Sequence, residues 1–202
     1  MLKDKEIREP LFEFLDETFG KVRIIEEKTI GRSRADVLMV MENALVGIEI
    51  KSDADTYERL ARQVRDYNSF FDYNIVAVGT SHAAHIAEHV PDWWGIITIE
   101  EIDGKADFYY YRKIQPNPKA IDQKRQLGFL WRPELAHIQE QNGLAKYQRQ
   151  SKRFVIGKIL EEVEEATLKR QICEELFERD YNEIAEKIAD FKKSKRNTGK
   201  KF

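Results

Sequence analysis

Residues 47–53 read GIEIKSD, so an apolar run carries a glutamate and a lysine two positions apart. Successive side chains of a β-strand point to opposite faces, so the two isoleucines would share one face, and Glu49 and Lys51 the other. Burying an ionised side chain is costly unless it is paired or bound to a metal. The stretch therefore predicts either a strand with one solvated face or a strand that forms one wall of a functional site.

The pattern around this strand predicts an α/β fold with an α-β-β-β-α-β core and a mixed central sheet. A helix is expected over residues 4–19, with Pro10 as its start or as a kink. Apolar and β-branched runs predict six strands, at 21–29, 34–41, 45–51, 73–80, 94–100 and 106–114. A helix ending near Phe71 should follow the third strand, with Asp55 or Thr56 as its N-cap. A short helix is expected around residues 83–89.

The character of the sequence changes after Pro116 and Pro118, where strand patterns give way to helical ones. We therefore expect a core over residues 1–115 and an all-helical extension over 119–191, with helices near 133–143, 151–163 and 166–180. The extension is a candidate for gripping substrate, covering the sheet or forming a homodimer contact. Residues 192–202 hold six basic side chains and no acid, which is typical either of a disordered, solubilising end or of an arm that touches phosphates.

The composition indicates a soluble, cytoplasmic protein. Of 202 residues, 42% are apolar, which suffices for a sizeable core, yet no run reaches the roughly 18–20 apolar residues of a membrane span. The N-terminus lacks the apolar centre of a signal peptide, and a single cysteine, Cys173, rules out an intrachain disulfide. The net charge of −2 argues against a protein that coats nucleic acid by bulk charge.

Two acidic side chains should meet where the second and third strands pair. Asp36 opens the second strand, and a hairpin would bring it beside Glu49. Two neighbouring carboxylates repel each other unless a cation lies between them, and magnesium prefers oxygen ligands of this kind. The carbonyl of Ile50 is a further candidate ligand, and Lys51 is placed to hold a water or a phosphate oxygen. The donor set predicts a Mg²⁺ or Mn²⁺ site for hydrolysis of a phosphodiester.

The next helix adds a polar side chain to its apolar face. Gln63 lies four residues before Tyr67, one helical turn away, on the face that also carries Leu60 and Val64. A glutamine on a core face needs a hydrogen-bond partner. A polar cluster at the strand ends would supply that partner.

These segments together resemble the PD-(D/E)XK nuclease superfamily. The segments are RAD at 34–36, EIK at 49–51 and QVRDY at 63–67, and the last is similar to the Q-x-x-x-Y element of RecB-type nucleases. The likeness covers roughly residues 4–80 and includes the order of elements. It is closest to small, poorly characterised bacterial proteins of the superfamily, and it implies a restriction-endonuclease-like core and a DNA substrate.

The resemblance also implies roles for individual residues. Asp36 and Glu49 would bind the metal, and Lys51 would position the attacking water. Gln63 and Tyr67 would steady the site or the DNA backbone.

Three features depart from the family pattern or fit it weakly. Glu6 on the first helix would match an additional acidic metal position, but it does not fall on the apolar face of that helix. Ala35 stands where the superfamily's eponymous proline would be, and Pro10 makes the first helix uncertain.

Other readings of the same residues remain open at this stage. Glu49 and Lys51 would also suit a solvated face with a cross-strand ion pair to Asp36. Three histidines, at 82, 85 and 89, would share a helical face, although three ligands from one short helix rarely make a good metal site. The turn GRSR at 31–34, with Lys28, would suit either phosphate contacts or plain solvation.

The leading hypothesis is thus a divalent-metal-dependent nuclease that acts on DNA. The alternative is a non-catalytic nuclease-like module that binds nucleic acid or a protein partner. A hydrolase for another phosphate ester is the third hypothesis.

Overall fold

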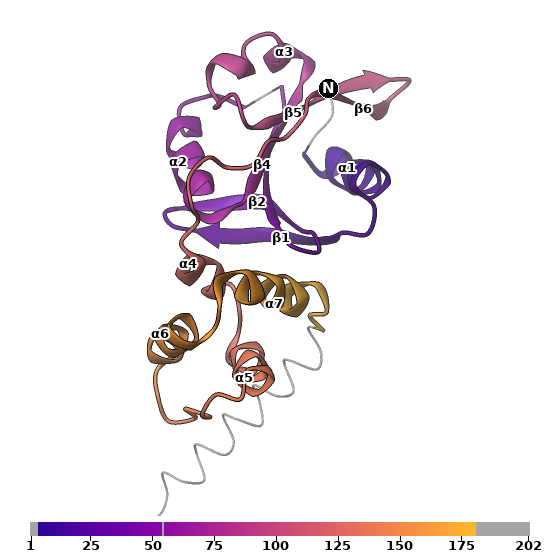
Figure 1. Ribbon diagram of the computed structural model, residues 1–202. Coiled ribbons are helices and arrows are strands. Elements are labelled where there is room, and N and C mark those ends of the chain that lie inside the picture. The colour runs from indigo at the N-terminus through magenta and orange to yellow at the C-terminus, as the bar shows by residue number, and fades with distance from the viewer. Residues whose placement is uncertain (1–3, 54, 181–202) are drawn as a thin grey trace, which may run out of the picture. The chain divides into compact units, whose positions relative to one another are not determined.

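The computed structural model describes residues 4–53 and 55–180, and the chain divides into two compact units, Met1–Arg125 and Gln126–Phe202. The strands are β1 Arg23–Ile30, β2 Ser33–Val40, β3 Leu45–Lys51, β4 Tyr73–Gly79, β5 Gly95–Ile102 and β6 Lys105–Arg112 (Figure 1). The helices are α1 Asp4–Phe19, α2 Leu60–Phe70, α3 Thr80–Ala83, the 3₁₀ turn η1 Ile86–Glu88, α4 Gln123–Leu127, α5 Arg132–Gln141, α6 Lys152–Glu162 and α7 Glu165–Phe177.

The first unit is built on one six-stranded sheet with its strands in sequence order from β1 to β6. The pairs β3–β4 and β4–β5 are parallel, and the other three are antiparallel. The α/β class, the α-β-β-β-α-β order and the mixed sheet predicted from the sequence are confirmed.

The two faces of β3 serve different purposes. Ile48 and Ile50 pack into an apolar core that α1 covers with Ile7, Leu11 and Leu15. The opposite face packs against α2. Figure 1 shows α1 and α2 on opposite sides of the sheet. Glu49 and Lys51 lie on the α2 side, as the alternation of the strand requires.

Two helix starts differ from the sequence-based expectation. The α1 helix runs from Asp4 through Pro10 without beginning at the proline. The expected N-cap at Asp55 or Thr56 is wrong, because α2 begins only at Leu60. The Asp55 carboxylate instead accepts hydrogen bonds from the backbone N–H and hydroxyl of Ser52, which ties it into the loop before the helix.

The first unit extends past residue 115, where the sequence suggested that the core ends. The Asn117 backbone N–H donates to the carbonyl of Asp72 (2.8 Å). Its side-chain amide donates to the carbonyls of Asn68 and Phe71, both at 3.0 Å. These three bonds fasten the segment after the last strand to the end of α2, so the segment belongs with the sheet.

In its described part, residues 126–180, the second unit consists of helices joined by loops and contains no strand. A buried ion pair links the start of α5 to the segment after α7. Arg179 donates through Nε and Nη2 to the Glu134 carboxylate at 2.6 and 2.8 Å. The guanidinium also covers the Trp131 ring at 4.6 Å. Residues 181–191 of the expected extension and the basic end at 192–202 lie outside the described residues.

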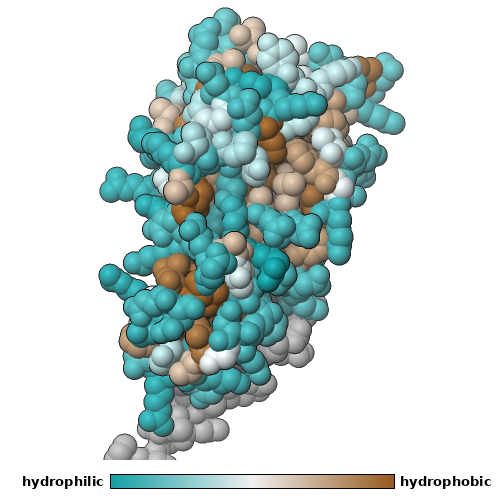
Figure 2. Space-filling model, viewed as in Figure 1, coloured by the Kyte–Doolittle hydropathy of each residue, from teal (hydrophilic) through white to brown (hydrophobic). Residues whose placement is uncertain are grey.

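Among residues 4–53 and 55–180, large apolar side chains are exposed at few positions. Those with high exposure are Ile102, Tyr109, Tyr111 and Phe154. On the face drawn in Figure 2, hydrophilic side chains cover most of the visible surface. In the described ranges, none of the helices has the length and apolar character needed to cross a bilayer.

Gly47 of β3 offers a test of the packing that supports the α2 side. A Cβ atom there would lie 2.2 Å from the Phe71 ring and 2.7 Å from the Tyr67 ring. Overpacking of this kind costs about 1–3 kcal/mol, so Gly47→Ala should lower the free energy of unfolding by that amount. Urea unfolding followed by circular dichroism would measure it.

Gly157 in α6 provides the matched control, because nothing lies within 4 Å of a Cβ built on it. Gly157→Ala should be neutral or should stabilise the helix by about 0.5–1 kcal/mol. If Gly47→Ala had the same free energy of unfolding as the wild type, the result would contradict the packing around Gly47.

The division into two units predicts that the sheet folds without the helical unit. A fragment of residues 1–125 should retain the near-ultraviolet circular dichroism of packed aromatic side chains. A fragment of residues 1–115 should melt at a lower temperature because it lacks the bonds of Asn117 to the end of α2. A molten 1–125 fragment would show that the first unit depends on the second.

Candidate functional site

The site forms where β2 separates from β3. The two strands pair only from Val40 to Val37 on β2, with Ile48 as the last partner on β3, whereas β2 stays paired with β1 as far as Ser33. The next antiparallel pair would place Asp36 opposite Glu49. The ladder ends at that point, and the opening between the strands contains both carboxylates.

The Asp36 side chain replaces the missing ladder bond. Its Oδ2 accepts a hydrogen bond from the Ile50 N–H at 2.9 Å. This bond satisfies a backbone donor that β2 no longer pairs and fixes the carboxylate at the mouth of the opening.

The two charges that the sequence placed on β3 are both buried and paired with each other. Glu49 is 2% exposed and Lys51 is 3% exposed, and Lys51 Nζ lies 3.0 Å from Glu49 Oε1. Gln63 of α2 contacts both, because its Nε2 donates to Glu49 Oε1 and its Oε1 accepts from Lys51 Nζ at 3.4 Å. The expectation that Gln63 finds its partner in a polar cluster is confirmed.

Tyr67 is fully buried and is at once a core residue and a member of this cluster. Its hydroxyl lies 2.8 Å from Glu49 Oε2 and 3.1 Å from the Ile48 carbonyl, and it accepts the Asp36 N–H at 3.2 Å. Burial, followed by the nearby Glu49 and Asp36 charges, raises the pKa of Tyr67 well above its usual range. Tyr67 therefore stays a neutral hydrogen-bond donor that holds Glu49 in place.

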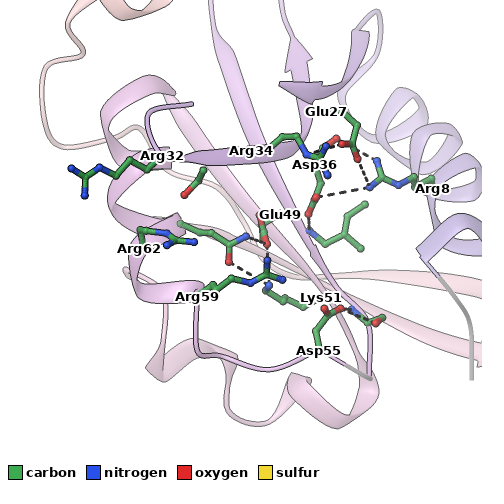
Figure 3. A pocket seen from close by; sticks show the side chains of 14 residues that line it. Arg8, Glu27, Arg32, Arg34, Asp36, Glu49, Lys51, Asp55, Arg59 and Arg62 are labelled. Carbon is green, nitrogen blue, oxygen red and sulfur yellow. Dashed lines mark hydrogen bonds and ion pairs between the residues drawn. The ribbon is translucent and has the colours of Figure 1, made fainter. Parts of the chain in front are cut away.

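An open cavity of about 460 Å³ is bordered by Asp36, Glu49, Lys51 and Gln63, but not by Tyr67 (Figure 3). The lining residues are Arg8, Glu27, Arg32, Ser33, Arg34, Asp36, Glu49, Ile50, Lys51, Ser52, Asp55, Arg59, Arg62 and Gln63. Five arginines and one lysine face four carboxylates, so the wall carries an excess of positive charge. The cavity suits an anionic ligand.

Arg8 is a cavity residue that the sequence analysis missed. It lies 3.9 Å from Asp36 Oδ1 and donates to the Asp36 carbonyl at 3.4 Å. Glu26 and Glu27 of β1 hold it with ion pairs of 3.1 and 3.3 Å. The sequence gives one indication that Arg8 could face the sheet. It lies three residues before the core residue Leu11, at the border of the apolar face of α1.

Glu27 has an unusual backbone for its residue type. Its φ is +59°, in the left-handed region that costs a non-glycine residue about 1–3 kcal/mol. Its carboxylate holds Arg8 at 3.3 Å and Arg34 at 2.7 Å. The strained residue thus anchors two of the cavity's arginines.

Some residues predicted from the sequence do not reach the cavity. Glu6 is exposed on α1 and does not line the cavity, so the structure does not place it with Asp36 and Glu49. Arg8, half a turn further on, lines the cavity instead. Of the basic residues in and near the GRSR turn, Arg32 and Arg34 line the cavity, and Lys28 does not.

The histidine face does not form a metal site. His82 bonds the Tyr57 hydroxyl at 2.9 Å and the Ser52 carbonyl at 3.1 Å, and His89 stacks on Tyr57. Throughout residues 4–53 and 55–180, no three histidine, cysteine or acidic side chains gather closely enough to hold a metal ion. His82 and His89 instead fasten the loop before α2 to the segment that follows β4.

The donors at the strand opening fit a hard divalent cation by their chemistry. Asp36 and Glu49 provide carboxylate oxygens at the cavity wall, which Ile50 also lines. Magnesium is commonly bound by one or two carboxylates, with water and substrate phosphate completing its shell. A cation held by this pair would therefore depend on water and substrate for most of its ligands.

Two solved structures resemble the chain to a limited extent. One is a protein of unknown function from Silicibacter pomeroyi, SPO1766, with 18% identity and a TM-score of 0.48 over 64% of this chain and 82% of that one. The other is SfsA from Pyrococcus furiosus in complex with Ca²⁺, with 15% identity and a TM-score of 0.37 over 55% of this chain and 64% of that one.

Sequence comparison gives a relative and a family. Protein cII of Enterobacteria phage P4 is 24% identical over 147 residues, which are 71% of this chain and 55% of the relative, so the chain spans about half the relative's length. The family described as Bacteriophage P4 protein cII matches residues 1–199. The chain therefore belongs to the Bacteriophage P4 protein cII family.

Proposed function

We propose that this protein is a divalent-metal-dependent nuclease that hydrolyses phosphodiester bonds in DNA. One observation carries the proposal: Asp36 and Glu49 lie at the opening between β2 and β3, with the buried Lys51 beside them, in a cavity with excess positive charge. The resemblance of RAD, EIK and QVRDY to the PD-(D/E)XK superfamily supports the same reading.

Asp36 and Glu49, with the Ile50 carbonyl, would hold the cation. A bound Mg²⁺ or Mn²⁺ would supply Lewis acidity and lower the pKa of a coordinated water. The protein's own task is then to orient that water and the phosphate.

Lys51 is suited to orienting the water. An ammonium group has three N–H donors. Two of those on Lys51 have acceptors in the protein, Glu49 Oε1 and Gln63 Oε1. The third donor is left for a water or a phosphate oxygen in the cavity. Since the lysine is buried, that donor points in a fixed direction.

Gln63 and Tyr67 would act through Glu49. The amide donates to Oε1 and the phenol lies against Oε2, so each carboxylate oxygen has a fixed neighbour from α2. They are positioning residues in this proposal.

A second candidate function is a nucleic-acid-binding module without catalysis. Its support is that both oxygens of Glu49 already have protein partners and that Lys51 neutralises its charge. Such a cluster is satisfied without a metal. The two candidates differ in their response to manganese and in whether they cut DNA.

Metal binding is tested by thermal stability. A ligand that binds only the native state raises its melting temperature according to the ligand concentration over its dissociation constant. Millimolar Mn²⁺ should therefore raise the melting temperature of the wild type and not of Asp36→Asn, which keeps an acceptor for the Ile50 N–H. Asp107→Asn, on β6 and outside the cavity, is the matched control and should respond as the wild type does. Equal shifts in all three proteins would place the metal elsewhere.

Catalysis is tested with Lys51→Met, which preserves the aliphatic stem and removes the ammonium. The wild type should cleave DNA with Mg²⁺ or Mn²⁺ and stop with chelator, and the variant should be about 10²–10⁴-fold slower. Gln63→Ala should fall between them, because it acts through Glu49 and Lys51. Circular dichroism must first show that the variants are folded, since removing one partner of a buried ion pair costs about 3–5 kcal/mol.

Two outcomes would decide against this mechanism. Wild-type rates with folded Lys51→Met would exclude this active site and would point to a contaminating nuclease. Absence of cleavage of single-stranded, double-stranded and branched DNA by a wild type that binds DNA would favour the non-catalytic module.

A further inference from the structure

Three of the cavity's arginines differ from the other two in their partners. Arg8 and Arg34 are engaged by the carboxylates of β1. In the part of the chain that the structure describes, no acidic side chain lies within ion-pair distance of Arg32, Arg59 or Arg62. No ion pair with a described residue therefore neutralises their charge, and all three are exposed.

The three arginines come from two segments that meet at the cavity. Arg32 lies in the turn between β1 and β2, Arg59 is the residue before α2, and Arg62 follows in its first turn. In Figure 3 they lie on one side of Glu49, whereas Arg8 and Glu27 lie on the other side, beyond Asp36. The cavity thus has an uncompensated basic wall beside the carboxylates.

A single phosphate does not account for that wall. A phosphoryl group undergoing hydrolysis would lie against Asp36, Glu49 and Lys51, where charge compensation is already present. Arginine is well suited to phosphate, because its planar guanidinium donates two parallel hydrogen bonds to the oxygens. Three further arginines would suit additional phosphates beside the first.

We propose that Arg32, Arg59 and Arg62 form a subsite for the phosphates next to the scissile one. This assigns a nucleic-acid strand as the substrate, rather than a phosphomonoester or a small diester. The inference rests on the proposed function for the identity of the scissile phosphate, but the subsite can be tested by binding alone.

The binding experiment uses a fluorescein-labelled DNA oligonucleotide, single- or double-stranded, without divalent metal. Anisotropy would give the dissociation constant of the wild type and of Arg59→Ala/Arg62→Ala over a range of salt concentrations. Each lost phosphate contact should reduce the slope of log affinity against log salt by about 0.7–0.9, and the double variant should bind at least about tenfold more weakly. Arg59→Lys/Arg62→Lys should recover part of the affinity, since the charge is kept.

Arg65→Ala is the matched control. Arg65 is an exposed arginine on the same helix that does not line the cavity, so its loss should leave the slope unchanged. Equal weakening by Arg65→Ala and by the double variant would mean that bulk charge alone binds DNA. That result would overturn the subsite.

Catalysis separates a strand from a small ester. The double variant should lose at least about tenfold more kcat/KM on the oligonucleotide than on bis(p-nitrophenyl) phosphate, with the difference mainly in KM. Equal losses on both substrates would overturn the subsite. If the wild type cleaves neither substrate, the proposed function fails while the binding experiment still decides the subsite. If it cleaves DNA and the double variant binds and cleaves equally well, the subsite fails and the proposed function stands.

Discussion

The buried ion pair of Glu49 and Lys51 sets the conditions that the rest of the first unit meets. Both groups are almost fully withdrawn from solvent, 3.0 Å apart. Removing two charges from water costs several kcal/mol for each ion, and their attraction repays it only if their other hydrogen bonds are also made. Gln63 and Tyr67 make those of Glu49, and Gln63 makes one of those of Lys51, so the position of α2 is tied to the charges that β3 buries.

The backbone is adapted to the same requirement. A glycine at position 47 leaves room for the Tyr67 and Phe71 rings on the α2 side, so the phenol can lie over β3 and reach Glu49. The β2 strand leaves β3 one residue before the carboxylates, and Asp36 accepts the backbone N–H that this exposes. A continuous ladder would have closed the opening. The end of the β2–β3 ladder is therefore what places the two carboxylates at an open edge of the sheet.

The parts of the site that local patterns encode could be predicted from the sequence. Strand alternation put Glu49 and Lys51 on one face, the hairpin put Asp36 beside them, and helical spacing aligned Gln63 with Tyr67. Arg8 and Arg59 could not be found in this way, because their place depends on how α1 and the loop before α2 lie in three dimensions. Glu6 lies outside the cavity, in keeping with its position off the apolar face of the first helix, which the spacing already indicated. The start of α2 was misjudged because Asp55 bonds back to Ser52 instead of capping the helix.

The charge of the cavity differs from that of the chain. The protein carries −2 overall, yet six basic side chains and four acidic ones line the cavity. Overall composition argues against binding by bulk charge, but a concave wall with an excess of one charge concentrates the electrostatic field locally. The strained Glu27 contributes to this arrangement, because it holds Arg8 and Arg34 away from the basic wall. Two arginines are thereby tied to the acidic side, whereas the three on the other side have no ion pair with a residue that the structure describes, so under our proposal an extended anion would contact them there.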